Sequence, residues 1–221
     1  MRHLGQPRVL ASACLAALAT ALAGYPRLSL WLDRPESIWF LEAVIFLCGI
    51  VLWGFVFAWH APYAHRPVFA FQVEAKPFIA ATLAGMVAAL MFYLWFDPLL
   101  RAKVPEEYPA NPGQWFAFTL FFLAFDQLFL VFAPFAWLMR LVHSRRVATV
   151  LTVLFGGLVL TLKTRHSTAP ISMALFAALL VARIGMGFLS VSFYLRGGVI
   201  LVWWWTLLFE ARHWFYLAHH S

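Results

Sequence analysis

Long apolar stretches alternate with short polar segments along the whole chain. Each apolar stretch approaches or exceeds the roughly 20 residues that a helix needs to cross a bilayer. The stretches are residues 9–30, 38–60, 77–98, 115–142, 147–163, 170–194 and 198–218. Proline and charged residues mark most of the boundaries, as in DRPES, HSRR and LRGG. The pattern predicts an all-α, polytopic membrane bundle with about seven transmembrane helices.

The composition agrees with this pattern and excludes a soluble domain. Hydrophobic residues make up 64% of the chain and charged residues 11%. We therefore expect a single integral membrane domain over residues 1–221, with three N-terminal helices within 1–100 and a four-helix core over 115–218. Cys14 and Cys48 both fall inside predicted spans, so neither a disulfide framework nor a thiolate metal site is predicted.

The charges indicate membrane lipids, not nucleic acid, as the partners of the basic side chains. The net charge of +7 comes from loops between apolar spans, where it attracts anionic headgroups. Arginine is concentrated beside the tight HSRR turn, at Arg140, Arg145 and Arg146. Because cytoplasmic loops retain positive charge, this cluster favours a cytoplasmic N-terminus. The apolar stretch after MRHLGQPR does not close in a small-residue cleavage site, so the N-terminus is predicted to be retained.

A few polar side chains fall inside the predicted spans, where each is costly and should face the bundle interior. They are Glu42 in the second span, Asp126 and Gln127 in the fourth, Arg183 in the sixth, and Glu210 and His213 in the last. Helix–helix hydrogen bonds or ion pairs are the simplest interpretation of such residues. Arg183 is a suitable ion-pair partner for either Asp126 or Glu42, and the sequence does not choose between them.

Glu210 and His213 are three residues apart, so a helix places them on one face. A carboxylate beside an imidazole can orient a general base or complete a metal site. The neighbouring Arg212, Trp214 and Tyr216 suggest an alternative, an interfacial belt in which charges and aromatic rings meet the headgroups.

The remaining histidines give no metal prediction. His60 and His65 are predicted in a loop, and His143 precedes the SRR turn. A zinc site on a helix would ordinarily place two histidines on one face beside a carboxylate, as in H-E-x-x-H, and this spacing does not occur.

The order of the last four predicted spans carries a resemblance to a known family. DQLFLVFAPF is followed by the basic turn and helix LVHSRRVATVLTVLFGGLVL, and SFYLRGGVILVWWW opens the last span. Over about residues 115–215 this order resembles the core of the CAAX-protease and bacteriocin-processing (Abi) family of intramembrane endopeptidases. Members of that family carry Glu-Glu-x-x-x-Arg, then Phe-x-x-x-His, and later a YLRTGSLW turn. The resemblance implies a water-activating site between the core helices.

The positions that the family uses for catalysis hold other residues in this chain. They are Asp126 and Gln127 for the two glutamates, Val131 for the arginine, Val159 for the histidine after Phe155, and Leu207 and Ala211 for the third motif's histidine and asparagine. Asp126 retains a carboxylate, and burial favours a basic one. It would need Glu210 and His213 from the last helix to replace its lost partners.

The chain is therefore predicted to be a pseudoenzyme, a noncatalytic binding or accessory subunit in a bacterial inner membrane. Eleven tryptophans and 23 phenylalanines supply surfaces for other membrane subunits, a bound lipid or a pigment. The three consecutive tryptophans at 203–205 should turn at least one ring toward lipid or a partner. Two alternatives stay open: a nonstandard endopeptidase using Asp126, Glu210 and His213, and a small-molecule or lipid transporter.

Overall fold

The computed structural model describes residues 6–31, 35–64, 67–166 and 171–220. Every regular element in these ranges is helical, and no strand occurs among them. Within the same ranges, six helical stretches are long and apolar enough to cross a membrane. The predicted fold class, an all-α polytopic membrane bundle, is confirmed.

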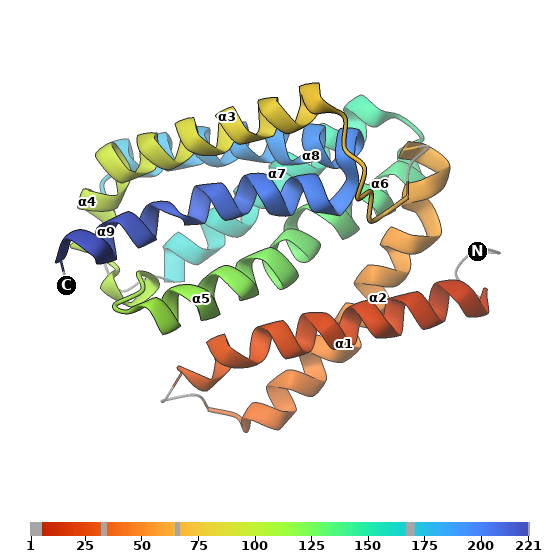
Figure 1. The fold of residues 1–221 in the computed structure, drawn as a ribbon, viewed down its shortest axis with the longest axis horizontal. Helices are drawn as coiled ribbons and strands as arrows, with labels where there is room; N and C mark the ends of the chain where they lie inside the picture. The colour runs from red at the N-terminus through yellow and green to blue at the C-terminus, as the bar shows by residue number, and fades with distance from the viewer. Residues whose placement is uncertain (1–5, 32–34, 65–66, 167–170, 221) are drawn as a thin grey trace.

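The helices follow the predicted order, and their ends shift by only a few residues (Figure 1). Their bounds are α1 Pro7–Ser29, α2 Ile38–Ala64, α3 Ala75–Met91, α4 Asp97–Arg101, α5 Pro112–Phe121, α6 Ala133–Val142, α7 Arg145–His166, α8 Met173–Glu210 and α9 Arg212–His220. Side chains cap the starts of four of them, at Ser37, Asn111, Ser144 and Ser172. Asn111 accepts a hydrogen bond from the Gln114 amide at 2.9 Å, and Ser172 accepts one from the Leu175 amide at 3.3 Å.

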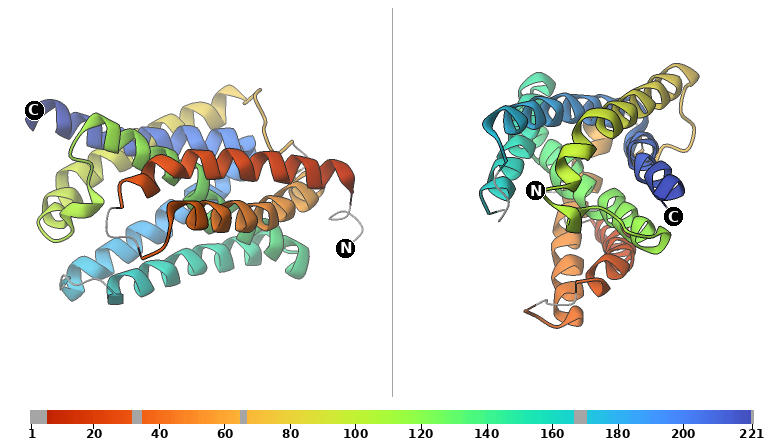
Figure 2. Two further views of the ribbon diagram at one scale, coloured as in Figure 1. Left: turned by 90° about the horizontal axis from the view of Figure 1, so that it is seen from below. Right: turned by 90° about the vertical axis from the view of Figure 1, so that its left-hand side faces the viewer.

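The longest helical stretch, Met173–Ala218, reverses direction within α8. The backbone leaves the helical region at Gly197 (φ −148°, ψ 15°) and Gly198 (φ 64°, ψ −158°). As one straight helix, its 46 residues would extend about 69 Å, more than twice the thickness of a hydrocarbon core. The two halves instead run in opposite directions (Figures 1 and 2). This stretch therefore supplies two passes, with the break where the LRGG segment predicts it.

Gly198 is required by both conformation and contact. Its φ of 64° lies in the left-handed region that side-chain-bearing residues rarely adopt. A Cβ at this position would lie 2.5 Å from the carbonyl oxygen of Val68. The same oxygen accepts a hydrogen bond from the Val199 amide at 3.0 Å. The segment that leads into α3 is thereby fastened onto the turn between the last two passes.

Small residues let the helices approach closely, as is common in membrane bundles. A Cβ on Gly49 of α2 would lie 3.1 Å from the Cβ of Ala17 in α1. A Cβ on Gly85 of α3 would lie 2.8 Å from the Cβ of Leu208 in α8. The ribbon accordingly shows α1 beside α2 and α3 beside α8 (Figure 1).

The fourth span is not a uniform α-helix. Two π-helical stretches, Phe122–Asp126 and Leu128–Phe132, lie on either side of Gln127. Pro134 follows them and lacks the amide hydrogen that an α-helix would pair with the carbonyl of Leu130, so a wider turn is expected there. The widened winding directs Asp126 into a large cavity and Gln127 into a separate small chamber.

The three consecutive tryptophans bond to three different parts of the bundle. Trp205 is buried and donates to Ser190 at 3.1 Å. Trp203 and Trp204 are half-buried, and their indoles donate to the Leu123 carbonyl at 2.8 Å and to the Thr82 hydroxyl at 2.9 Å. All three rings therefore fix the last pass within the bundle, and each is at least partly buried.

We expect Gly198→Ala to destabilise the protein by about 2 kcal/mol or more, because it combines left-handed strain with a contact on Val68. Gly185→Ala is the matched control, since nothing lies within 4 Å of a Cβ built there. Denaturant titration in mixed micelles would compare the two variants. Equal denaturation midpoints for Gly198→Ala and Gly185→Ala would contradict the role assigned to Gly198.

Candidate functional site

A polar cavity lies beside the start of α9, the last helix. Its volume is about 460 Å³. The end of α1, the start of α5, the end of α7 and the start of α9 meet there, with loop residues before α5. Lys163 and Glu107 form an exposed rim, whereas Glu210 and His213 are buried.

Four of the predicted polar residues line this cavity: Asp126, Arg183, Glu210 and His213. Gln127 lines the small chamber beside it, and Glu42 is not among the residues of either space. The cavity thus brings together side chains from the fourth span and from both halves of α8, which are far apart in the sequence.

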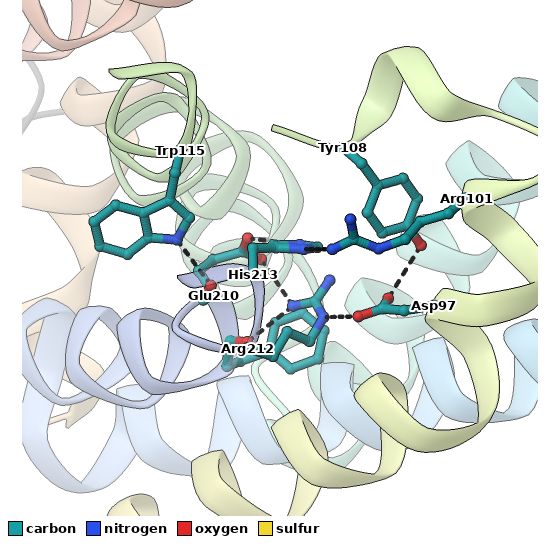
Figure 3. A network of polar contacts seen from close by, with 8 residues as sticks. Asp97, Arg101, Tyr108, Trp115, Glu210, Arg212 and His213 are labelled. Carbon is teal, nitrogen blue, oxygen red and sulfur yellow. Dashed lines mark hydrogen bonds and ion pairs between the residues drawn. The ribbon is translucent and has the colours of Figure 1, made fainter. Parts of the chain in front are cut away.

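Glu210, Arg212 and His213, which line the cavity, belong to a larger set of polar contacts (Figure 3). We call Asp97, Arg101, Glu210, Arg212 and His213 the Arg212 network. The Nε of Arg212 donates to the Oδ2 of Asp97 at 3.2 Å, and its Nη1 donates to the Phe209 carbonyl at 2.8 Å. The same Nη1 lies 3.5 Å from the Oε1 of Glu210. Arg212 is only 8% exposed, so the interfacial belt suggested by the sequence is wrong for this residue.

Both ring nitrogens of His213 face a partner. An Nη2 of Arg101 lies 3.3 Å from Nδ1, and the Oε2 of Glu210 lies 3.5 Å from Nε2. A guanidinium can only donate, so Nδ1 is the acceptor and the proton belongs on Nε2, toward Glu210. The predicted contact between Glu210 and His213 is present, with both side chains buried. The imidazole has no nitrogen left for a substrate or water.

Asp97 is the residue of the network that the sequence did not single out. It follows an apolar run directly and precedes a proline, which made it look like the boundary of the third span. In the structure it is 2% exposed. Its Oδ1 accepts from the Tyr108 hydroxyl at 3.0 Å and its Oδ2 from Arg212. A carboxylate at the end of a span opposite an arginine is the signal that could have found it.

Tyr108 lies in the connection before α5, outside the membrane-spanning stretches. Burial raises the pKa of its phenol, and the adjacent carboxylate of Asp97 raises it further. The phenol is consequently a neutral hydrogen-bond donor to Asp97 throughout the physiological pH range. The guanidinium of Arg101 lies between the rings of Tyr108 and Tyr216, at 4.4 and 3.4 Å from their centres.

Asp126 and Arg183 do not form the predicted ion pair. In the described part of the chain neither side chain has a hydrogen bond or an ion-pair contact, although each feels the charge of the other. Glu42 does not pair with Arg183 either, and its Oε1 is buried without a partner among the described residues. The Arg183 guanidinium packs beside Gly156, where a Cβ would lie 3.5 Å from its Nε.

The small chamber has a volume of about 20 Å³ and shares Phe122, Arg183, Met186 and Phe209 with the lining of the cavity. The Oε1 of Gln127 and the hydroxyl of Thr206 are buried there and have no partner within the described residues. The chamber has the size and the polar groups to hold one water molecule. Gln127 therefore faces inward, as the sequence predicts for a polar residue in a span.

His60 is a correction to the sequence analysis, which placed it in a loop. The second helix continues to Ala64, and His60 is buried with its ring 4.4 Å from the ring of Tyr194. Its partner in that prediction, His65, lies outside the described residues. His143 ends α6 in a left-handed conformation, with φ of 53°, in agreement with a turn.

The chemistry around Glu210 and His213 does not suit a metal ion. Across the ranges that the structure covers, no group of three histidine, cysteine, aspartate or glutamate side chains gathers closely enough to hold one. The two guanidinium groups beside the pair would also repel a cation. Glu210 and His213 instead contact each other and these two guanidinium groups.

Comparisons with protein-family models, with curated proteins and with solved structures each found no match.

We expect Asp97→Asn to cost about 3 kcal/mol of unfolding free energy, because it leaves the buried Arg212 short of a carboxylate. Glu107→Gln is the matched control: it removes the carboxylate of the exposed pair with Lys163, at 2.7 Å, and should cost about 1 kcal/mol or less. Reversible unfolding in mixed micelles would measure both. Similar losses for the two variants would contradict a structural role for the buried pair.

Alkaline stability should depend on Tyr108. Since the pKa is raised in the folded protein, the stabilisation is fully present below the unfolded-state value near 10 and is lost as pH rises beyond it. The wild type should therefore lose stability relative to Tyr108→Phe as pH rises above about 10. Unfolding midpoints of the two proteins measured between pH 8 and about 11 test this, and parallel curves would contradict it.

Proposed function

We propose that the chain is a noncatalytic membrane protein that binds a ligand in the cavity between α1, α5, α7 and α8. The observation that carries this proposal is the division of the polar groups at this end of the bundle. Glu210 and His213 are engaged with neighbouring side chains, whereas Arg27, Asp126 and Arg183 line an open space. Side chains that are engaged with their neighbours stabilise the fold, whereas side chains that line an open space are available to a ligand.

The geometry argues against acid–base chemistry at Glu210 and His213. A general base needs a nitrogen or oxygen that can take a proton from water within hydrogen-bond reach. The acceptor nitrogen of His213 faces Arg101, and Glu210 faces Arg212 and His213. Asp126 lines the same cavity but has no hydrogen bond to either of them in the described chain.

The cavity has the properties of a ligand site. A volume of about 460 Å³ falls within the range of small-molecule pockets, roughly 300–1,000 Å³. Phe118, Phe121 and Phe122 contribute an aromatic wall, and a few charged groups lie among them. An ionisable group inside a membrane span is a strong indication of function, and Arg183 lies ten residues into α8.

A second candidate, the nonstandard endopeptidase, is favoured by one observation: Asp126, Glu210 and His213 line the same cavity. The resemblance to the Abi core points the same way. For this candidate, a membrane substrate should accumulate uncleaved in cells that carry Asp126→Asn with Glu210→Gln. For the binding protein, substrate levels should be unchanged.

The proposal includes a location and an assembly state. The six apolar stretches show that the chain suits a membrane, and we infer a bacterial inner membrane with the N-terminus in the cytoplasm. In that orientation the cavity opens on the outer side. The proposed ligand-binding role would fit an accessory subunit of a larger membrane complex.

The binding proposal predicts that purified protein retains a small molecule in the cavity. Leu160→Trp should expel it, because Leu160 lines the cavity and the larger ring fills it. Leu162→Trp is the matched control on the same helix, since Leu162 is 48% exposed and does not line the cavity. Native mass spectrometry from mild detergent would show bound mass in the wild type and control only. Equal bound mass in all three proteins, or none in any, would overturn the proposal.

A further inference from the structure

Three charged side chains line the cavity without a hydrogen bond or an ion pair in the described chain: Arg27, Asp126 and Arg183. Arg27 lies with its guanidinium carbon 3.5 Å from the centre of the Phe118 ring, and no carboxylate of the described residues lies within ion-pair distance of it. Its side chain and that of Arg183 both attract Asp126 through space. The two arginines and the carboxylate thus line the same cavity without forming an ion pair in the described chain.

The other charges around the cavity cancel. Lys163 is bound to Glu107 at 2.7 Å. The Arg212 network contains two guanidinium groups and two carboxylates, so it is neutral as a unit. With Arg27, Arg183 and Asp126 added, the described groups of this region carry one surplus positive charge. A ligand with a single negative charge would balance it.

The cavity reaches from the surface toward the middle of the bundle. Lys163 lies near the end of α7, whereas Arg183 lies about 15 Å along α8 from its start and Asp126 about 21 Å beyond the start of α5. Apolar side chains line the space between these charges: Phe118, Phe121, Phe122, Leu160, Leu179 and Met186. This arrangement suits a molecule with both a polar head and an apolar body.

We propose that the ligand is an amphiphile whose head is a phosphodiester monoanion bearing a hydroxyl group, seated between Arg27 and Arg183. This inference rests on the proposed binding function. Guanidinium groups bind phosphate oxygens through charge-assisted hydrogen bonds. The ionised Asp126 accepts a hydrogen bond from the head's hydroxyl, and it disfavours a head with two negative charges.

The test is native mass spectrometry of the full-length protein titrated with four probes. Phosphatidylglycerol has the inferred head, phosphatidylcholine has the same phosphodiester with a quaternary amine, and phosphatidic acid is a phosphomonoester. Glycerophosphoglycerol is the free head without tails. We expect phosphatidylglycerol to bind at least roughly tenfold more tightly than phosphatidylcholine. Equal binding of the free head and of phosphatidylglycerol would overturn the amphiphile and leave a soluble phosphodiester as the ligand.

Variants locate the interaction within the cavity. Arg183→Gln should lower the affinity for phosphatidylglycerol to that for phosphatidylcholine, and Arg140→Gln, at the exposed end of α6, should not. If Arg183→Gln fails to fold, Arg27→Gln at the end of α1 provides the same test. Asp126→Asn raises the surplus charge to two, so it should shift the preference toward phosphatidic acid.

The outcomes separate this inference from the proposed function. Wild-type affinity for phosphatidylglycerol in both arginine variants, or an unchanged preference in Asp126→Asn, would overturn the head-group assignment alone. Leu160→Trp would still report whether another molecule occupies the cavity. If Leu160→Trp leaves every bound molecule in place, the cavity is not the site and both proposals fail.

Discussion

The charge on Arg212 is the constraint on which this end of the molecule depends. A guanidinium does not lose its proton inside a protein, so burial obliges the fold to surround it with acceptors. Asp97 comes from the end of the third span, Glu210 from the last helix, and Phe209 supplies a carbonyl. The hydrogen bonds of Arg212 therefore connect segments that are more than 100 residues apart in the sequence. It also holds Tyr108 and the loop before α5 in place.

The charged side chains in this region fall into two groups with different roles. Around Arg212 the donors and acceptors face each other, and little is left for another molecule. Across the cavity, Arg27, Arg183 and Asp126 lie apart from one another. Desolvated charges without an ion-pair partner destabilise a fold, so the presence of these charges favours a role in ligand recognition.

The sequence predicted the helices well because apolar length is decided locally. The seven runs and the break at Gly197 and Gly198 required no knowledge of neighbours, and the contact of Glu210 with His213 follows from helical spacing alone. The contacts that a polar residue makes with distant segments could not be predicted in the same way. Asp97 stands at the end of the predicted third span, directly before Pro98, and its burial was not predicted. Arg212 was consistent with a charge that reaches the headgroups. Each became interior only when a distant segment packed over it. The π-helical winding around Gln127 likewise depends on more than the local pattern.

The bond between the Val68 carbonyl and the Val199 amide imposes an order on biosynthesis. The acceptor leaves the ribosome roughly 130 residues before its donor, a delay on the order of ten seconds at ordinary elongation rates. During that time α3 can enter the membrane, but the segment before it cannot yet bond to the turn between the last two passes. The bundle is thus completed only when the last two passes have been synthesised. A chain truncated before them would lack the surface against which α3 packs.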